Sequence, residues 1–394
     1  MRIKFGKHLL WAFTSLFLFT TCDLEKIEPG SGGNAVKFNT TVGGNANDFP
    51  NDLIVASDGG YVVVGYSQSF TGGGDNQAYI VKLNKQGSQQ WENNFGGAKD
   101  DYARGVTATS DGGFILCGYT QSFNAAGNQD VFLVKVNAQG AKVWEKFYGA
   151  PDTTEVAYAI VPVGTAGDFM VAYVTYGTPQ MVKLMRINAN GSKISEKTVK
   201  TGTNFVYRMI KTSDNKLVLV GSESDSGTKT YILKLNEDGS FIWEKTFPAT
   251  NTNYTPGYAV AELSNKNLVV AGSELGSNDH DFNLVAYNEI GGELWDAAWG
   301  GANADELFGI VRTADNQLVV MGYSSSFSGQ NEIYLSKRSS TDGSEIWKKN
   351  FINIGNLWGD VERCPDGGFV LCAGQNQANA DIIVVKTDAN GEYQ

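Results

Sequence analysis

Polar side chains recur in this sequence about every fifty residues, and four of the seven form an acidic set whose carboxylates could act together. The set consists of Asp48, Asp101, Glu155 and Asp305. Carboxylate oxygens are preferred ligands of Ca²⁺, so these residues are weak candidates for a cation site if the fold gathers them. Aspartates beside turns commonly accept hydrogen bonds from backbone N–H groups, and we favour that capping role here. The sequence therefore predicts no metal and no cofactor, with a bound Ca²⁺ as the alternative.

A second polar set follows the first, three or four residues further along each copy of the pattern. Its members are Asp52, Arg104, Tyr158, Tyr207, Arg208, Tyr258 and Asp360. Asn51, Phe308 and Gly359 hold the position three residues on in the remaining copies. An arc of tyrosines facing an acidic pair would suit a polar ligand with an apolar face, such as a sugar or a peptide. Packing between neighbouring elements would explain the tyrosines without any ligand.

Catalytic chemistry finds little support among the remaining residues. Beyond the first 22 residues His280 is the only histidine, and it lies between acidic residues. The chain has no G-x-S-x-G motif and no phosphate-binding glycine loop. Cys117, Cys364 and Cys372 form no C-x-x-C pair, which argues against a disulfide framework or a zinc site and favours core packing. We therefore predict that the protein is not an enzyme.

The elements that position these residues come from an internal repeat. SDGGYVVVGYS (57–67) matches SDGGFILCGYT (110–120), and five further tracts occupy the same slot. The anchoring apolar residues are Tyr61, Phe114, Phe169, Leu217, Leu268, Leu318 and Phe369. Each copy contains four short strands separated by Asp-Gly, Asp-Asn or Gly turns, without helical periodicity. Seven such copies predict an all-β, seven-bladed β-propeller, in which the first strand of each blade lines an axial channel. Both polar sets fall on those first strands.

The two ends of the chain complete one another. The last copy supplies its third strand at 381–388 and then stops, so its fourth strand is missing. FNTTVGG (38–44) resembles fourth-strand segments such as WENNFGG (91–97), although no strand of its own copy precedes it. We predict that residues 36–44 complete the C-terminal blade and close the ring, which removes an open sheet edge. This closure would make Asp52 and Asp360 neighbours.

A turn followed by tryptophan recurs near the end of most copies, as in NKQGSQQW (84–91) and NEDGSFIW (236–243). The tryptophans are Trp91, Trp144, Trp243, Trp295 and Trp347, and the third copy has ISEKT (194–198) in their place. The element resembles the tryptophan-docking turn of quinoprotein-type propellers. The array from about 36 to 394 also resembles the DGG[YF]-type propeller repeats of Bacteroidetes envelope lipoproteins. We expect the tryptophans to be structural, because a flat ring wedged between blades buries a large apolar area.

The N-terminal segment predicts export and attachment to a membrane. Residues 1–21 combine a basic start with an apolar run too short for a confident transmembrane span, which is typical of a signal peptide. LFTTC resembles a bacterial lipobox, which implies that Cys22 becomes the acylated first residue. Residues 22–35 would then form an acylated tether before the single propeller domain of 36–394. The net charge of −11 argues against a nucleic-acid partner.

These observations predict an exported, lipid-anchored monomer of the bacterial outer membrane. It would touch the membrane through its anchor only, and act as a non-catalytic binding or scaffold module for an envelope protein or glycan. One alternative is a carbohydrate-active or other hydrolytic enzyme that uses the acids and tyrosines of the channel. Another is an assembly scaffold of the outer membrane. The loops at 67–77, 120–130 and 324–332 share one face of the ring and suit either binding or solvated turns.

Overall fold

The computed structural model describes residues 36–70, 74–124, 126–224, 229–247, 257–275, 279–327, 331–352, 357–375 and 379–393. The expected signal peptide (1–21), lipid anchor Cys22 and tether (22–35) lie outside these residues. The described residues form strands and turns, without a helix. Accordingly, no helix among them is long and apolar enough to cross a bilayer.

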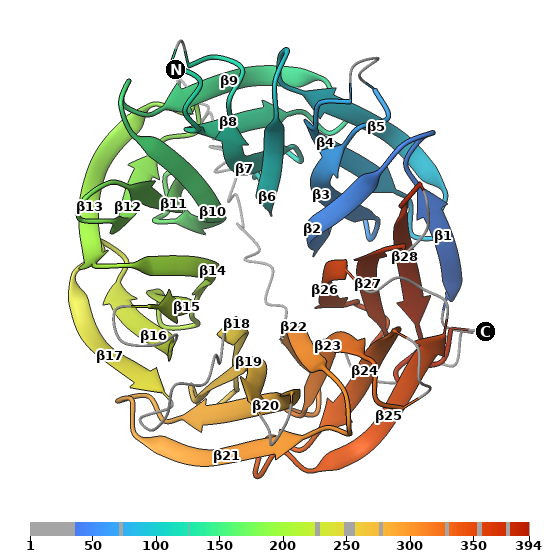
Figure 1. Ribbon diagram of the computed structural model, residues 1–394. Coiled ribbons are helices and arrows are strands. Elements are labelled where there is room, and N and C mark those ends of the chain that lie inside the picture. The colour runs from blue at the N-terminus through green and yellow to red at the C-terminus, as the bar shows by residue number, and fades with distance from the viewer. Residues whose placement is uncertain are drawn as a thin grey trace, which may run out of the picture. The chain divides into compact units, whose positions relative to one another are not determined.

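The described residues fold into seven four-stranded antiparallel sheets arranged as blades around a ring (Figure 1). The first blade is β2 (Asp48–Val55), β3 (Tyr61–Ser67), β4 (Gln77–Leu83) and β5 (Gln89–Phe95). The second is β6 (Asp101–Ala108), β7 (Phe114–Thr120), β8 (Asp130–Val136) and β9 (Lys142–Tyr148). The third is β10 (Thr154–Val163), β11 (Asp168–Tyr176), β12 (Met181–Ile187) and β13 (Lys193–Thr201). The predicted seven-bladed propeller is therefore confirmed.

The remaining blades follow in chain order around the ring. The fourth is β14 (Asn204–Lys211), β15 (Lys216–Glu223), β16 (Lys229–Asn236) and β17 (Phe241–Phe247). The fifth is β18 (Gly257–Glu262), β19 (Leu268–Leu275), β20 (His280–Tyr287) and β21 (Glu293–Trp299). The sixth is β22 (Asp305–Arg312), β23 (Leu318–Ser324), β24 (Glu332–Arg338) and β25 (Glu345–Ile352). The seventh is β26 (Leu357–Arg363), β27 (Phe369–Gly374), β28 (Ile382–Thr387) and β1 (Phe38–Val42).

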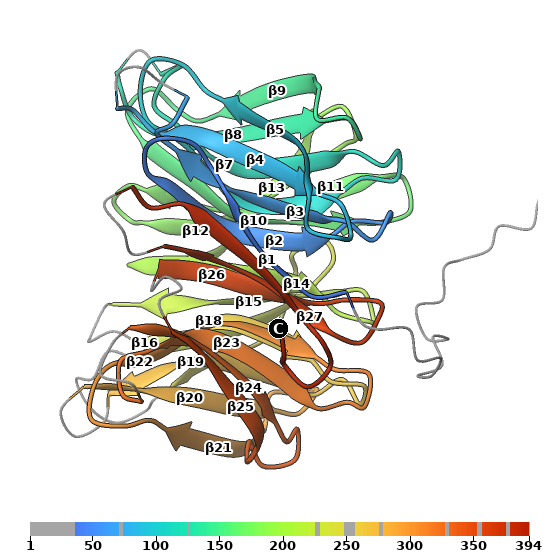
Figure 2. The same cartoon turned by 90° about the vertical axis from the view of Figure 1, so that its right-hand side faces the viewer.

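The ring closes as the sequence predicts. Strand β1 pairs antiparallel with β28, in a register that runs from Phe38 opposite Lys386 to Val42 opposite Ile382. Figure 2 shows this blade from the side, with β1 in the same blade as β26 and β27. Ladder hydrogen bonds therefore join the two ends of the domain, and the seventh blade has no missing outer strand.

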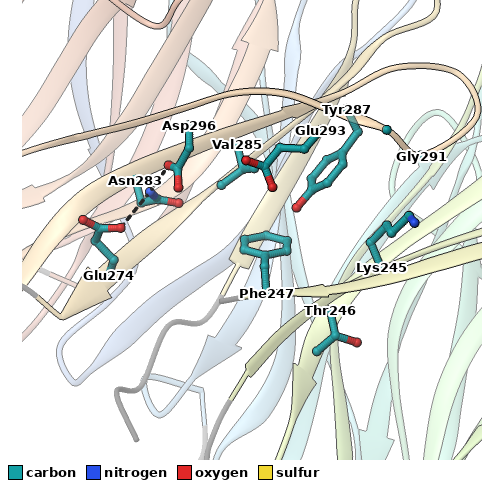
Figure 3. A pocket seen from close by; sticks show the side chains of 11 residues that line it. Lys245, Thr246, Phe247, Glu274, Asn283, Val285, Tyr287, Gly291, Glu293 and Asp296 are labelled. Atoms are coloured by element: carbon teal, nitrogen blue, oxygen red, sulfur yellow. Dashed lines mark hydrogen bonds between the residues drawn. The ribbon is translucent and has the colours of Figure 1, made fainter. Parts of the chain in front are cut away.

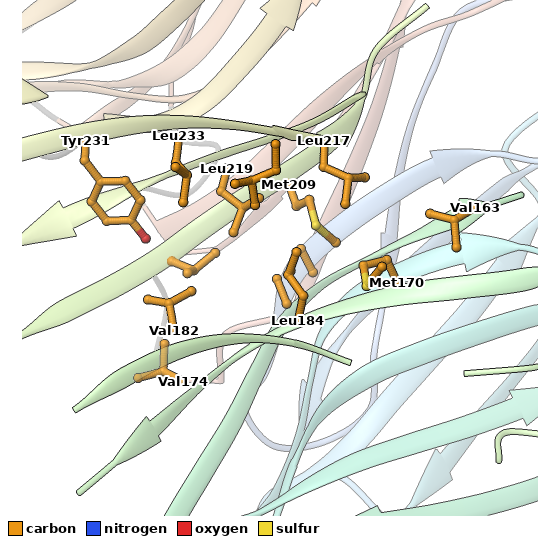
Figure 4. Close-up of a cluster of buried hydrophobic side chains, with 14 residues drawn as sticks. Val163, Met170, Val174, Val182, Leu184, Met209, Leu217, Leu219, Tyr231 and Leu233 are labelled. Atoms are coloured by element: carbon orange, nitrogen blue, oxygen red, sulfur yellow. The ribbon is translucent and has the colours of Figure 1, made fainter. Parts of the chain in front are cut away.

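The hydrophobic core lies between blades rather than at one centre. Second and third strands such as YVVVGYS and QAYIVKL are buried along nearly their whole length, because neighbouring blades cover both of their faces. Figure 4 shows one such layer, where Val163 and Met170 of the third blade meet Leu217, Leu219 and Leu233 of the fourth. The three described cysteines are buried and free, and Cys117 and Cys372 pack in two of these layers.

The tryptophans of the outer strands dock onto the next blade. Trp91 Nε1 donates a hydrogen bond to the carbonyl oxygen of Ala138 at 3.1 Å, and a Cβ on Gly140 would meet the Trp91 ring at 2.6 Å. Gly140 has φ of +82°, so the turn needs glycine both for its backbone and for the ring. The same donation recurs from Trp144 to Ala189, Trp243 to Glu289 and Trp295 to Ser340. The structural role expected for the tryptophans matches these contacts.

Two blades lack a tryptophan at this position. In the third blade Ser195 pairs with Arg186 at the register where Trp91 pairs with Lys82 in the first, so no indole reaches the next turn. In the seventh blade the Phe38 ring takes the place of the indole, and a Cβ on Gly87 would lie 2.5 Å from that ring. The segment that closes the ring thus also supplies its docking side chain.

Candidate functional site: a pocket in the axial channel

The acidic set at the start of the innermost strands caps the turns between blades. Asp48 Oδ2 accepts hydrogen bonds from the Gly44 amide at 2.7 Å and from Ser69 Oγ at 2.8 Å. Asp101 accepts the same pair from Gly97 and Ser122, and Asp305 from Gly301 and Ser326. The serines come from the three repeated loops, which therefore brace these turns. The capping interpretation holds for these three aspartates.

The fourth member of that set, Glu155, is held by Thr153, and burial raises its pKa. Each of the four weak metal candidates thus belongs to a separate blade and has its own local partners. Among the residues that the structure describes, no group of three or more His, Cys, Asp or Glu side chains is placed to hold a metal ion.

Each innermost strand carries one β-bulge. The side chains at the seven bulges belong to Asn51, Arg104, Tyr158, Tyr207, Tyr258, Phe308 and Trp358. A bulge leaves one residue out of the ladder and redirects its side chain. All seven of these residues line one pocket of about 340 Å³, together with Tyr66, Tyr102, Arg208 and Gly359. The innermost strands surround the axis in Figure 1, so this pocket lies within the channel.

Aromatic rings form most of the pocket wall. Tyr66 and Tyr102 have ring centroids 4.3 Å apart, and Tyr207 meets Tyr258 edge to face at 4.9 Å. Trp358 lies 4.9 Å from the rings of both Tyr258 and Phe308 and is 47% exposed. Ring pairs of this kind each contribute about 0.5–1.5 kcal/mol beyond the burial of their area, so the contacts stabilise the wall.

The structure corrects the predicted residue of the seventh blade. The sequence spacing places Gly359 at the position of Tyr158 and Tyr207. In the first six blades, the bulged residue directly precedes the residue that pairs with the fourth residue of the second strand, counted from its anchoring apolar residue. In the first blade, Asn51 precedes Asp52, which pairs with Val64. In the seventh blade Gly359 is itself paired, opposite Ala373, and the bulge falls one residue earlier, at Trp358. The indole of Trp358 therefore takes the wall position, and Gly359 contributes backbone.

The acidic pair also differs from its predicted role. Arg208 Nη1 donates to Asp52 Oδ1 at 2.6 Å, and Arg208 Nη2 forms an ion pair with Asp360 Oδ2. Asp52 Oδ2 accepts a further hydrogen bond from the Val106 amide at 2.8 Å. Asp52 and Asp360 are buried and do not line the pocket, so they hold Arg208 instead of facing a ligand.

Arg208 crosses the channel to reach both aspartates. It comes from β14, which lies across the ring from β2 and β26 (Figure 1). The other blades place small residues at this level of the channel, namely Gly105, Ala159, Ala259 and Gly309. A Cβ on Gly309 would already meet Asp360 Oδ1 at 3.2 Å. The bridge thus occupies space that the small residues leave and joins blades one, four and seven across the axis.

The bridge concentrates three carboxylates around one guanidinium. Burial raises the pKa of Asp360, although the charge of Arg208 opposes the rise. Burial and the charge of Asp360 raise the pKa of Glu362, two residues further along β26. Burial disfavours the charge of Arg208, but Asp360 and Asp52 hold its pKa above the usual value. The cluster therefore keeps its guanidinium charged, while burial disfavours a charge on Asp360 and on Glu362.

A second cavity, of about 410 Å³, lies at the rim between the fourth and fifth blades (Figure 3). Asn283 pairs with Gly272 where Tyr79 pairs with Gly65 in the first blade, so an amide replaces a large ring there. Its Nδ2 donates to Glu274 Oε2 at 3.1 Å and to Asp296 Oδ1 at 2.8 Å. Asn283, Glu274 and Asp296 all line this cavity, which holds no residue of the predicted site.

Comparisons with known proteins agree on the fold and stop there. A family model described as domain of unknown function (DUF5122) beta-propeller matches residues 212–241. No curated protein sequence matches the chain. Among solved structures, polysaccharide lyase Uly1 is similar at TM-score 0.57 and 11% identity, with 91% of this chain and 94% of that chain covered.

Two further solved structures show the same likeness. The Neurospora crassa Pan2 WD40 domain gives TM-score 0.55 at 11% identity, over 91% of this chain and 98% of that chain. Quinohemoprotein alcohol dehydrogenase from Comamonas testosteroni gives TM-score 0.52 at 9% identity, over 91% and 77%. At such identities the likeness shows a shared propeller and nothing about activity.

Proposed function

We propose that this protein is an exported, lipid-anchored propeller of the bacterial outer membrane that binds a glycan of the envelope in its axial pocket, without catalysis. It acts as a monomer, meets the membrane through Cys22 alone, and takes no nucleic acid. One observation carries the proposal. Seven blades that share a backbone pattern each direct a bulged side chain into one pocket, and five of the seven side chains are aromatic. Aromatic faces interspersed with polar groups suit the flat and hydroxylated rings of sugars.

Binding fits the pocket better than hydrolysis. A hydrolase built on the channel acids would need a carboxylate in contact with its substrate. Asp52 and Asp360 are buried and engaged by Arg208 beneath the pocket wall. The ionisable side chains that do line the pocket are tyrosines and arginines. His280 is not among the lining residues. The geometry therefore favours the non-catalytic role over the hydrolytic alternative.

The proposal is tested by measuring glycan binding to the purified propeller, residues 36–394. Glycans released from the envelope of the bacterium that makes the protein would be screened, and those that bind would be titrated by calorimetry. We expect Tyr258→Ala and Trp358→Ala each to weaken binding about tenfold or more, because each removes a wall of the pocket. Phe241→Ala is the matched control, since Phe241 is 65% exposed on the outer strand β17. Equal binding by all variants, or recovery of envelope proteins without any glycan, would reject the pocket as the glycan site.

Attachment to the membrane has its own test. Cys22→Ser in the full chain should prevent acylation and move the protein from the membrane fraction to the soluble fraction. Metabolic labelling with a clickable fatty acid should mark the wild-type chain and leave the variant unmarked. Unchanged labelling of the variant would remove the anchor from the proposal.

A further inference from the structure

Two arginines line the axial pocket, and their surroundings differ in the number of acidic partners. Arg208 is bound by two carboxylates. Arg104 forms no ion pair or hydrogen bond within the described residues, and its Nε is buried without a partner there. A buried donor without an acceptor costs free energy unless a ligand or water satisfies it. This contrast separates an arginine that two carboxylates hold from one whose guanidinium has no carboxylate partner among the described residues.

The neighbours of Arg104 hold the guanidinium but do not neutralise it. Its Cζ lies 5.8 Å from the ring centroid of Tyr119 and 5.3 Å from that of Tyr158. Burial, then Tyr102, raises the pKa of Tyr66 to about 12, with Arg104 opposing the rise. Burial also raises the pKa of Tyr119 and of Tyr176. The phenols of Tyr66, Tyr119 and Tyr176 therefore stay protonated near neutral pH and supply no negative charge.

Aromatic contacts leave the edge of a guanidinium available. Rings stack on its faces, whereas its N–H donors lie in the plane and point past the rings. A planar carboxylate matches these donors with two parallel hydrogen bonds. The side chains of Tyr207, Tyr258 and Trp358 line the same pocket from other blades and contribute apolar surface to it. One small pocket thus combines a carboxylate receptor with an aromatic wall.

We propose that the axial pocket recognises an acidic sugar, with the carboxylate of a uronic acid residue on Arg104 and its ring against the aromatic wall. This proposal rests on the proposed glycan-binding function and names the class of glycan. The overall charge of the protein is −11, which on its own would repel an acidic polymer. An uncompensated cation inside the pocket offsets that repulsion at the one place where the ligand would sit. The pocket volume of about 340 Å³ suits one or two sugar residues rather than a long segment.

The test uses two probes that differ in charge and little in shape. A short oligomer of galacturonic acid and its fully methyl-esterified form would be titrated into residues 36–394 by calorimetry. The free acid should bind about tenfold to a hundredfold more tightly than the ester, because a hydrogen bond to a charged group contributes about 1.5–3 kcal/mol. Arg104→Gln should reduce affinity for the acid to the level of the ester, and should leave affinity for the ester unchanged. Arg104→Lys should restore part of the loss.

The outcomes separate this inference from the function on which it rests. Equal affinity for acid and ester, with both lost in Trp358→Ala, would overturn the acidic-sugar inference and keep glycan binding. Failure of both probes and of all released glycans would overturn both. Preference for a phosphorylated sugar over the uronate would reject the carboxylate. Thermal unfolding of Arg104→Gln within a few degrees of wild type would show that lost affinity is not lost folding. If added salt weakens binding of the free acid to the wild-type protein but not to Arg104→Gln, the result would support a charge contact.

Discussion

The outer rim and the axial channel use the same seven repeats in opposite ways. At the rim, four blades repeat one contact, in which an indole donates to a carbonyl of the next blade and lies over the glycine of its turn. In the channel, the seven equivalent bulges present asparagine, arginine, three tyrosines, phenylalanine and tryptophan. Repetition at the rim reflects a need shared by all blades, namely packing against a neighbour. Variation in the channel produces one asymmetric surface, as the proposed ligand site requires.

Variation alone does not identify a ligand contact, and the two arginines show why. Arg208, like Arg104, has no counterpart in the other blades, yet its guanidinium forms ion pairs with Asp52 and Asp360. Its ion pairs therefore cross the channel and join blades, as the tryptophan contacts do at the rim. Under the proposal, the lack of a carboxylate partner, rather than an unusual residue type, distinguishes Arg104 from the structural Arg208.

The largest expected effect concerns Arg208. Arg208→Met leaves Asp52 and Asp360 buried beside one another without a cation, and removing one side of a buried ion pair costs about 3–5 kcal/mol. Arg104→Met is the matched control and should change the free energy of unfolding by less than about 1 kcal/mol, because no carboxylate depends on it. Chemical denaturation measures both. Equal losses in the two variants would erase the distinction between the arginines.

The next effect is at the rim. Trp243→Ala removes a half-buried indole and its hydrogen bond to Glu289, and we expect a loss of about 2 kcal/mol, less than for a fully buried tryptophan. Ser195→Ala serves as the control, since Ser195 holds the same register in the third blade without an indole. Its free energy of unfolding should stay within about 0.5 kcal/mol of wild type. A Trp243 variant as stable as the Ser195 variant would contradict the structural role of the docking tryptophans.

The sequence predicts the rim more completely than the channel, and the reason is physical. Strand spacing, turn glycines and the missing fourth strand are local patterns, so blade number and closure by β1 follow from them. The position of Trp358 depends on where a ladder breaks, which spacing alone does not show. The sequence pattern did not predict Tyr66 and Tyr102, because they stand at other positions of the repeat than the two polar sets. Tyr66 lies one residue before the end of β3, and Tyr102 one residue after the start of β6. The engagement of Arg208 with Asp52 is a contact between blades one and four, and only tertiary structure reveals it.

A smaller effect should appear in the pH dependence of the free energy of unfolding. The pKa of Glu362 is raised in the folded protein by burial and by Asp360, so the folded state holds a proton that the unfolded state loses. The stability contributed by that proton is complete below the ordinary glutamate pKa and declines as pH rises through the raised value. Glu362→Gln, which stays neutral, should be more stable than wild type at pH 8 by about 1 kcal/mol. The difference should shrink toward pH 4. A gap that widens at low pH would reverse the assignment.

The smallest effect tests whether the rim contact can be added where it is absent. Ser195 stands at the tryptophan register, and Gly239 in the next turn has φ of +75°, as the docking glycines do. A Cβ at Gly239 would lie 3.3 Å from Lys197 and 3.4 Å from Leu184, so those side chains now cover the turn that an indole covers elsewhere. Ser195→Trp should raise the free energy of unfolding by up to about 1 kcal/mol, because the indole buries apolar area but must displace Lys197. Denaturation measures the gain, and Ser195→Leu separates apolar area from indole geometry. A loss of stability with Trp but not with Leu would mean that blades three and four approach too closely for the ring, and that Lys197 and Leu184 are the docking contact of this interface.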